Sequence, residues 1–219
     1  MEILKHYLIS PDLKKFNKFE PKLNIAVLAS GEGTNFQVLI DLYKNKELDI
    51  DIKFLISNKE NAGCIKRAIK SDIPYALILE NNYENKEKFE AEIIKILQES
   101  NVELIVMAGW MKIASENFVN SFKDRIINIH PSLLPSFKGK NPINDALKHK
   151  ALVTGCSVHF VEKEVDSGKL IIQAALSIKT DDDLSSLTNK IHEIEHKILP
   201  YAISEAGFTI RNKLRIKSS

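Results

Sequence analysis

The sequence predicts an α/β fold: an open, mostly parallel, twisted sheet with helices on both faces, ending in an antiparallel hairpin and a closing helix. Three observations predict it. Apolar runs of strand length alternate with helical segments as far as residue 130. These runs are continuously apolar, which is typical of strands buried on both faces of a parallel sheet. Two later β-rich runs, Thr154–Val161 and Lys169–Ile178, follow each other without a helix and predict the hairpin.

The elements follow in order along the chain. Asn24–Ser30 is an apolar run that ends at a glycine, and Thr34 is predicted to begin a helix as its N-cap. The further strands and helices, joined by right-handed crossovers, are Ile50–Ser57, Ala62–Lys70, Tyr75–Leu79, Glu84–Glu99, Glu103–Ala108, Ser115–Phe122 and Arg125–Ile129. A helix at Leu184–Glu205 closes the chain. It is predicted to be interrupted near Pro200 and to be capped by the acidic run at residues 181–183.

Length and composition indicate one domain, residues 23–219, preceded by an N-terminal extension, residues 1–22. The formal charge of +2 argues against a protein whose main task is to bind nucleic acid. The two cysteines cannot form a disulfide framework, and no apolar run reaches the roughly 20 residues of a membrane span. The first residues do not resemble a secretory signal. A cytoplasmic protein is therefore expected.

A glycine-containing turn, Ser30–Asn35, lies between the first strand and the first helix. A helix N-terminus at the carboxyl edge of a parallel sheet presents free N–H groups, and glycines let an anion approach the backbone. The turn lacks the dinucleotide-binding pattern, because Phe36 occupies the third glycine position, and it lacks the P-loop pattern. It predicts a phosphate site. The alternative is a tight turn whose small residues serve only packing.

Asn128 and His130 end a buried strand at the same edge of the predicted sheet. The two-residue period of a strand puts both side chains on one face, and two prolines stiffen the loop that follows. An amide beside an imidazole can hydrogen-bond a carbonyl and move a proton at the same carbon. A purely structural histidine is the alternative. The coincidence of Asn, His and a rigid loop favours a functional pair.

Asp166 lies in the tight turn between the two later β-rich runs. Alone it is an ordinary turn aspartate. It joins the pair only if the hairpin folds back over His130, where a carboxylate would raise the pKa of the imidazole and hold a water. His159 is equally balanced between a packed strand histidine and a supporting role.

Together these motifs resemble those of the folate-dependent glycinamide ribonucleotide formyltransferases of purine biosynthesis. The resemblance extends from about Asn24 to about Ala206 and implies a Rossmann-like formyltransferase fold. Its most specific part is the Ser30–Asn35 turn, whereas the Asn-x-His-Pro-Ser-Leu-Leu-Pro run with a later Asp is shared by the wider superfamily. The other matching segments are Ala108–Ile113, Thr154–His159, Asp166–Gly168 and Glu195–Ile198.

The resemblance implies a role for each matching residue. Asn128, His130 and Asp166 match the catalytic residues. The substrate phosphate would be bound by Gly33, Thr34 and Asn35, and the substrate ribose would contact Glu195. The residues implied near 10-formyltetrahydrofolate are Lys86, Met111, Lys112, Ile113, Ala114, Asn128, Glu162, Lys163, Glu164, Val165 and Asp166.

The implied reaction transfers a formyl group from N10 of the folate co-substrate to the amine of glycinamide ribonucleotide. Asn128 and a protonated His130 would donate to the oxyanion of a tetrahedral intermediate, and Asp166 would assist proton transfer. No metal is expected, because the His and Cys residues lack the spacing of a zinc site. The expected partners are small-molecule substrates, without nucleic acid or membrane, and the protein would be a monomer or a homodimer.

One position departs from the family pattern. Ile143 stands where many members carry a histidine, so a polar role there is lost or is served by a neighbour. The N-terminal extension lies beyond the minimal family domain and receives no function.

Other functions stay open. A formyltransferase acting on methionyl-tRNA or on a nucleotide-linked sugar would share these motifs, as would a formyltetrahydrofolate hydrolase. The methionyl-tRNA branch usually adds a basic RNA-binding domain and the hydrolase a regulatory domain, for which 219 residues leave little room. A non-catalytic nucleotide-binding module could use the same fold. The combination of Asn128, His130 and Asp166 argues against it.

Overall fold

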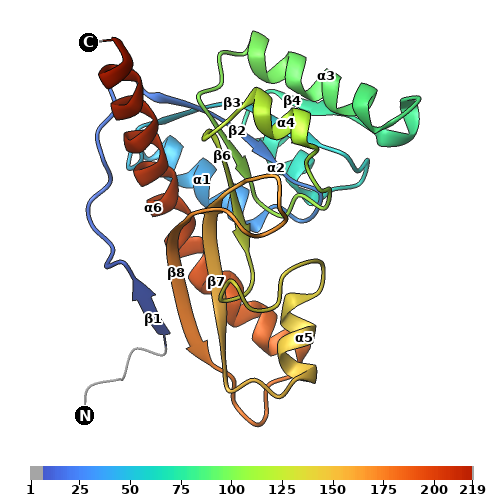
Figure 1. Ribbon diagram of the computed structural model, residues 1–219, viewed down its shortest axis with the longest axis vertical. Coiled ribbons are helices and arrows are strands. Elements are labelled where there is room, and N and C mark those ends of the chain that lie inside the picture. Colours follow the sequence, from blue (N-terminus) through green and yellow to red (C-terminus); the bar gives the residue numbers. More distant parts are fainter. Residues whose placement is uncertain (1–6, 219) are drawn as a thin grey trace.

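A computed structural model describes residues 7–218 of the chain (Figure 1). The strands of this part form one eight-stranded sheet in the order β1-β8-β7-β6-β5-β2-β3-β4. From β6 to β4 in this order the strands are parallel, whereas β7, β8 and β1 are added antiparallel. The bounds are β1 (Tyr7–Ser10), β2 (Leu23–Leu28), β3 (Ile50–Ser57), β4 (Tyr75–Leu77), β5 (Leu104–Met107), β6 (Ile126–His130), β7 (Val153–Phe160) and β8 (Leu170–Ser177). The predicted fold class is confirmed.

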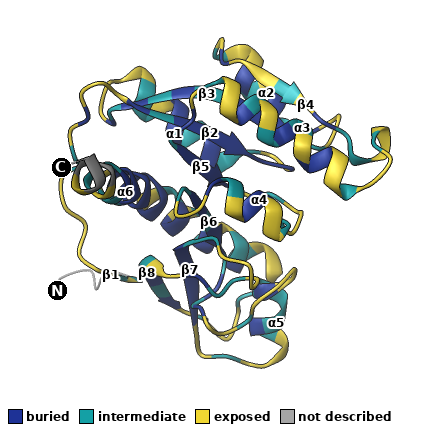
Figure 2. Ribbon diagram, turned by 45° about the horizontal axis from the view of Figure 1, so that its top comes forward, coloured by how far each residue is buried: buried dark blue, intermediate teal, exposed yellow. Residues whose placement is uncertain are grey.

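Helices cover both faces of the sheet because successive residues of its strands point to opposite sides. Ile25 and Val27 of β2 belong to a core shared with α1, α2 and α6, whereas Ala26 and Leu28 belong to a second core shared with α3 and α4. Figure 2 shows the buried residues concentrated along the central strands. The helices are α1 (Thr34–Lys44), α2 (Gly63–Lys70), the 3-10 turn η1 (Glu80–Asn82), α3 (Lys86–Glu99), α4 (Glu116–Ser121), α5 (Pro142–Lys148) and α6 (Leu184–Ser218).

The start of α1 and the course of α6 near Pro200 differ from those predicted. The N-cap of α1 is Gly33, not Thr34, because a left-handed residue (φ 71°) makes the turn and Thr34 is already helical. The interruption near Pro200 is also wrong, since α6 runs through this residue to Ser218. Pro200 removes one helical hydrogen bond, to the carbonyl of His196. The residues beside it, Leu199 and Tyr201, are buried in the core, and this burial outweighs the missing bond.

Asp183 caps α6 as the acidic run predicted. Its Oδ1 accepts the backbone N–H of Ser186 at 2.7 Å, and the hydroxyl of Ser186 accepts the backbone N–H of Asp183 at 3.0 Å. This reciprocal pair satisfies two of the donors that every helix start leaves free.

The N-terminal extension packs along the domain. Its strand β1 adds to the sheet edge beside β8, and the chain then follows α6 (Figure 1). The backbone N–H of Asn17 donates to the hydroxyl of Ser204 at 2.7 Å. Where the extension joins β2, Arg211 of α6 donates to the carbonyls of Pro21 and Lys22 at 2.6 and 3.0 Å. The extension is therefore tied to the last helix by polar contacts at several points.

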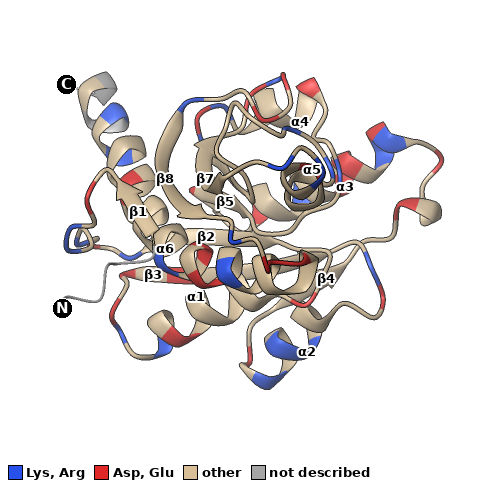
Figure 3. Cartoon of the chain, turned by 90° about the horizontal axis from the view of Figure 1, so that it is seen from below, with Lys and Arg blue, Asp and Glu red and all other residues tan. Residues whose placement is uncertain are grey.

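Charged residues of both signs are scattered along the chain in Figure 3 rather than gathered on one face. Among the described residues, no helix is both long enough and apolar enough to cross a membrane.

Among the lysines and arginines of α6, Arg211 should be the one whose replacement lowers the free energy of unfolding most. Its guanidinium makes a bidentate pair with Glu103 at 3.0 and 2.9 Å, and both side chains are less than a third exposed. Arg211→Met leaves two carbonyls without this donor and the Glu103 carboxylate with only the backbone N–H of Asn24. It should lower the free energy of unfolding by about 2 kcal/mol in urea titrations. Lys213→Met is the matched control, because its pair with Asp124 is more than half exposed and should contribute less than about 1 kcal/mol. Equal effects of the two changes would contradict this ranking.

Candidate active site

One pocket lies at the carboxyl edge of the parallel strands, where ligands bind in open α/β sheets. Its volume is about 390 Å³. Six segments line it: the turn after β2, the loop after β5, the end of β6, the loop that leads into the start of α5, the loop between β7 and β8, and the face of α6 that carries His192 and Glu195. Every residue predicted to bind or react with substrate, except Lys86, lines this pocket.

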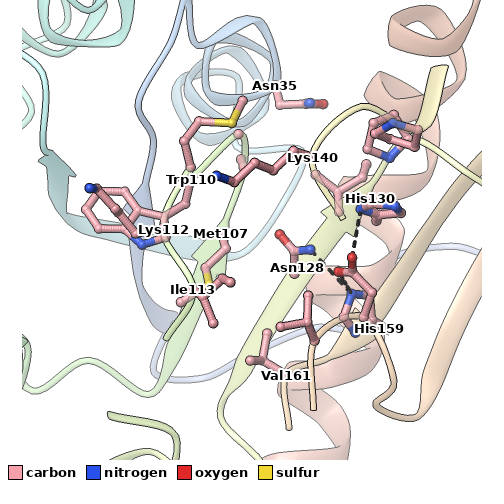
Figure 4. A pocket seen from close by; sticks show the side chains of 18 of the residues that line it. Asn35, Met107, Trp110, Lys112, Ile113, Asn128, His130, Lys140, His159 and Val161 are labelled. Atoms are coloured by element: carbon pink, nitrogen blue, oxygen red, sulfur yellow. Dashed lines mark hydrogen bonds and ion pairs between the residues drawn. The ribbon is translucent and has the colours of Figure 1, made fainter. Parts of the chain in front are cut away.

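Asn128 and His130 project from β6 into the pocket, as the two-residue strand period predicts (Figure 4). Strand β7 pairs with β6 so that His159 stands directly opposite Asn128. The two side chains meet, with Asn128 Nδ2 at 3.3 Å from His159 Nε2. His159 Nδ1 lies 2.8 Å from the carbonyl of Phe160 and therefore carries its proton there. When the ring is neutral, its Nε2 accepts from the amide N–H₂ of Asn128.

Asp166 reaches both histidines, so the hairpin does fold back over His130. The carboxylate lies 3.5 Å from His130 Nδ1 and 3.6 Å from His159 Nε2, and it accepts the backbone N–H of Gly139 at 2.9 Å. Asp166 has a positive φ of 51°, which a short polar residue tolerates better than most. The tight turn thus aims the carboxylate inward, and the structure brings the predicted catalytic residues together.

The surroundings of this cluster set its proton affinities. Burial lowers the pKa of His130, against the opposing effects of the Phe137 carbonyl and the Asp166 charge. Burial would raise the pKa of Asp166, but the contact with His159, the N–H of Gly139 and the nearby His130 together bring it below the usual value. His130 Nε2 lies 2.9 Å from the carbonyl of Phe137 and carries the proton of the neutral ring. The free lone pair of His130 therefore lies on Nδ1, facing Asp166.

The glycine turn is fixed by the protein itself. Gly33 is left-handed, and a Cβ there would lie 2.6 Å from the Cβ of Cys64, so no larger residue fits. Arg67 braces the turn from outside the pocket, donating to the carbonyl of Glu32 at 2.8 Å. Packing thus explains Gly33 without a ligand, and the alternative of a purely structural turn accounts for this glycine. What packing does not explain is the open N-terminus of α1, which faces the pocket through Gly33, Thr34 and Asn35.

Glu195 is a buried carboxyl in the same pocket. Burial raises its pKa to about 7, although the hydrogen bond from Asn35 Nδ2, at 2.9 Å, opposes the shift. The other amide atom of Asn35, Oδ1, is buried without a partner in the described part of the chain. An oxygen of Asn35 that needs a donor therefore lies beside a carboxyl that changes charge near neutral pH.

A family model described as formyl transferase matches residues 23–203. The chain belongs to the formyltransferase family. It is 38% identical over 204 residues to the human trifunctional purine biosynthetic protein adenosine-3, covering 93% of this chain and 20% of that protein. It is 37% identical over 180 residues to phosphoribosylglycinamide formyltransferase of Bacillus subtilis, covering 82% of this chain and 92% of that one. The chain thus spans about a fifth of the trifunctional relatives it matches.

Solved structures agree. Glycinamide ribonucleotide transformylase 1 from Symbiobacterium toebii superposes with a TM-score of 0.84 at 33% identity, covering 90% of this chain and 94% of that one. Phosphoribosylglycinamide formyltransferase from Bacillus halodurans gives a TM-score of 0.81 at 35% identity, covering 83% and 94%. The sequence-predicted family is confirmed.

The formyltransferase residues implied near the folate form the other half of the pocket. Met111 and Ile113 are more than half exposed there. Lys112 pairs with Glu80, and Lys163 pairs with Glu116 at 2.7 Å. Ala114, Glu162, Glu164 and Val165 also line the pocket. Lys86 does not; it lies at the start of α3, with its ammonium 3.7 Å from Glu90.

Several lining residues were not assigned to the site from the sequence. Trp110 stacks on Phe89 with ring centroids 6.5 Å apart and lines the pocket beside Met111. His192 precedes Glu195 by three residues, so both share one face of α6, and this spacing is the signal that could have found it. Lys140 also lines the pocket, and no local signal marked it. Ile143, which departs from the family pattern, lines the pocket as well. Within the described residues, no three His, Cys, Asp or Glu side chains form a group that could hold a metal ion.

Burial of Glu195 should make the stability of this protein depend on pH. The pKa of this carboxyl rises from 4.5 in the unfolded state to about 7 in the folded state. Its contribution to stability is therefore fully present below pH 4.5 and is lost as the pH rises through 7. Glu195→Gln removes this dependence. Its stability relative to the unchanged protein should therefore increase by about 2 kcal/mol between pH 5 and pH 8 in urea titrations.

Glu193→Gln supplies the control, because Glu193 is exposed on the same helix. Its effect should differ between the two pH values by no more than about 0.5 kcal/mol. If the two variants respond alike to pH, the carboxyl of Glu195 is not buried as described.

Proposed function

We propose that the protein transfers the formyl group of 10-formyltetrahydrofolate to the primary amine of glycinamide ribonucleotide. The observation that carries this proposal is the convergence of Asn128, His130 and Asp166 on one pocket that also contains the open N-terminus of α1. The names of the relatives that cover most of the chain support the same substrate.

The phosphate of the ribonucleotide would bind at the turn before α1. Free backbone N–H groups of Gly33, Thr34 and Asn35 point along a helix axis whose positive end favours an anion. The ribose would lie beside Glu195 and Asn35. A ribose hydroxyl is a donor that can satisfy the unpaired Asn35 Oδ1, and it can also donate to the Glu195 carboxyl. These contacts would fix the position of the amine relative to His130.

The folate co-substrate fits the other half of the pocket. A flat heteroaromatic ring can cover the exposed apolar side chains of Met111 and Ile113. A single exposed apolar residue needs no such explanation, but two that line one pocket favour a ligand. The loops that carry Met111 and Val165 both line the pocket. In this arrangement the formyl group would lie near Asn128, between the two substrates.

The side chains would then act in sequence. The amine nitrogen attacks the formyl carbon, a C–N bond forms, and the carbonyl electron pair moves onto oxygen. The amide hydrogen of Asn128 that is not directed at His159 donates to this oxyanion. His130 Nδ1 takes the proton from the attacking nitrogen, and Asp166 stabilises the imidazolium at 3.5 Å. The proton passes to N10 as the bond between N10 and the formyl carbon breaks.

This geometry favours proton transfer over direct donation by a protonated His130. Both ring nitrogens face protein acceptors: Nε2 faces the carbonyl of Phe137 and Nδ1 faces Asp166. To donate to the oxyanion, His130 would have to give up its contact with one of these two acceptors. Asn128 needs no such change, because only one of its two amide hydrogens is directed at His159.

A single assay tests the proposal. The protein is incubated with glycinamide ribonucleotide and 10-formyltetrahydrofolate, and deformylated folate is measured by absorbance. Product should form only when both substrates are present. Product without the ribonucleotide would indicate a hydrolase instead, and product only with methionyl-tRNA or an amino sugar nucleotide as acceptor would indicate another formyltransferase.

The proposed catalytic residues should each be needed for turnover. Asn128→Ala and His130→Gln should lower kcat at least about 100-fold, and Asp166→Asn should do the same, because each removes a donor or a charge from the reacting centre. Asp72→Asn is the matched control for Asp166, since Asp72 is a turn aspartate with a φ of 56° that lies outside the pocket. Circular dichroism verifies that each variant is folded. Near-normal kcat in a folded Asp166→Asn protein would contradict the mechanism.

A further inference from the structure

Three lysines line the pocket, and their surroundings differ. Lys112 is paired with Glu80 and Lys163 with Glu116, so both charges are already balanced. The ammonium of Lys140 has no hydrogen bond or ion pair with any described residue, and it is exposed. Lys140 is therefore the lysine whose charge is available to a bound anion.

The backbone of Lys140 is held in place by the catalytic cluster. The loop before it is fixed at two points: the carbonyl of Phe137 faces His130 Nε2, and the N–H of Gly139 donates to Asp166. Gly139 has a φ of 94°, a conformation that favours glycine. Two residues after Lys140, α5 begins at Pro142. The side chain thus starts from a rigid position at the pocket wall.

The side chain of Lys140 extends into the pocket between the start of α1 and the end of β6. In Figure 4, Lys140 lies between Asn35 and Asn128 and reaches over the pocket. The turn itself contributes an acidic residue, Glu32, and no basic one. Arg67 contacts the turn, but its guanidinium donates to the carbonyl of Glu32 and to the side chain of Gln37, and it does not line the pocket. Lys59 lies on the other side of the turn, in a separate hollow that it shares with Glu60. Of the lysines and arginines that line the pocket itself, Lys140 is the one without an ion pair to another described residue.

We propose that Lys140 is the cationic contact for the phosphate of the ribonucleotide. The proposal rests on the function proposed above and adds a residue to its phosphate site. Backbone N–H groups would fix the position of the phosphate, and the ammonium would balance its charge across the pocket. Removing a charge-assisted hydrogen bond of this kind weakens binding about tenfold.

Kinetics with each substrate varied in turn test the proposal. Lys140→Met keeps the length and apolar stem of the side chain and removes its charge. It should raise KM for glycinamide ribonucleotide about tenfold, and leave KM for 10-formyltetrahydrofolate and kcat within about twofold. Lys140→Arg should restore most of the affinity, because a guanidinium also binds phosphate.

Lys138→Met is the matched control, because Lys138 lies on the same loop, is exposed and does not line the pocket. It makes the same chemical change and should alter neither KM. A rise in the folate KM alone would assign Lys140 to the carboxylates of the folate and overturn the proposal. Unchanged values of KM for both substrates would overturn it as well.

Direct binding separates this proposal from the proposed function. Ribose 5-phosphate carries the phosphate and lacks the amine, so isothermal titration calorimetry measures the phosphate site without turnover. The unchanged protein should bind it, and Lys140→Met should bind about tenfold more weakly. This result together with no formyl transfer would refute the proposed function and keep the role of Lys140. Equal binding by the two proteins, or no binding by either, would refute the role of Lys140.

Discussion

The pocket depends on the carboxylate of Asp166. It accepts the backbone N–H of Gly139 and faces one nitrogen each of His130 and His159, so it joins the β6 strand end, the following loop and the β7–β8 hairpin. The hairpin residue Asp166 lies 27 residues after Gly139 in the sequence, and the sheet alone does not fix the two loops relative to each other. A buried charge with several partners is costly to disrupt, because removing one partner leaves the others unpaired. The same carboxylate that positions the loops also faces the nitrogen of His130 that would exchange protons.

Two buried carboxyls in this pocket have opposite electrostatic surroundings. Asp166 has two imidazoles and a backbone N–H, which together bring its pKa below the usual value despite burial. Glu195 has one amide donor, and burial raises its pKa to about 7. Pairs of groups whose surroundings separate their pKa values often mark distinct roles. Asp166 stays charged and can stabilise an imidazolium, whereas Glu195 can donate as well as accept a hydrogen bond near neutral pH.

The sequence predicted the features that depend on local pattern. It did not predict the features that depend on contacts between residues far apart in the chain. The central strands were predicted because continuous apolar runs have few other uses, and the strand period placed Asn128 and His130 on one face. Pro200 was expected to interrupt α6 because it has no N–H, but burial of the residues beside it keeps the helix continuous. The approach of Asp166 to His130 depends on hairpin placement, so the sequence could state it only as a condition. Lys140 was missed because the folded loop alone places it in the pocket.

Ile143 makes the part of the pocket wall formed by α5 apolar, which changes the contacts that it can make with a polar substrate. Ile143 lies in the first turn of α5, where it lines the pocket and packs against the main core. An aliphatic side chain stabilises the docking of this short helix but offers a substrate no hydrogen bond. Other polar residues that line the pocket are Lys140, three residues earlier, and His192 on α6. A polar role at position 143 is therefore lost or is served by a neighbour. Lys140 is a neighbour whose backbone is anchored through Gly139 to Asp166.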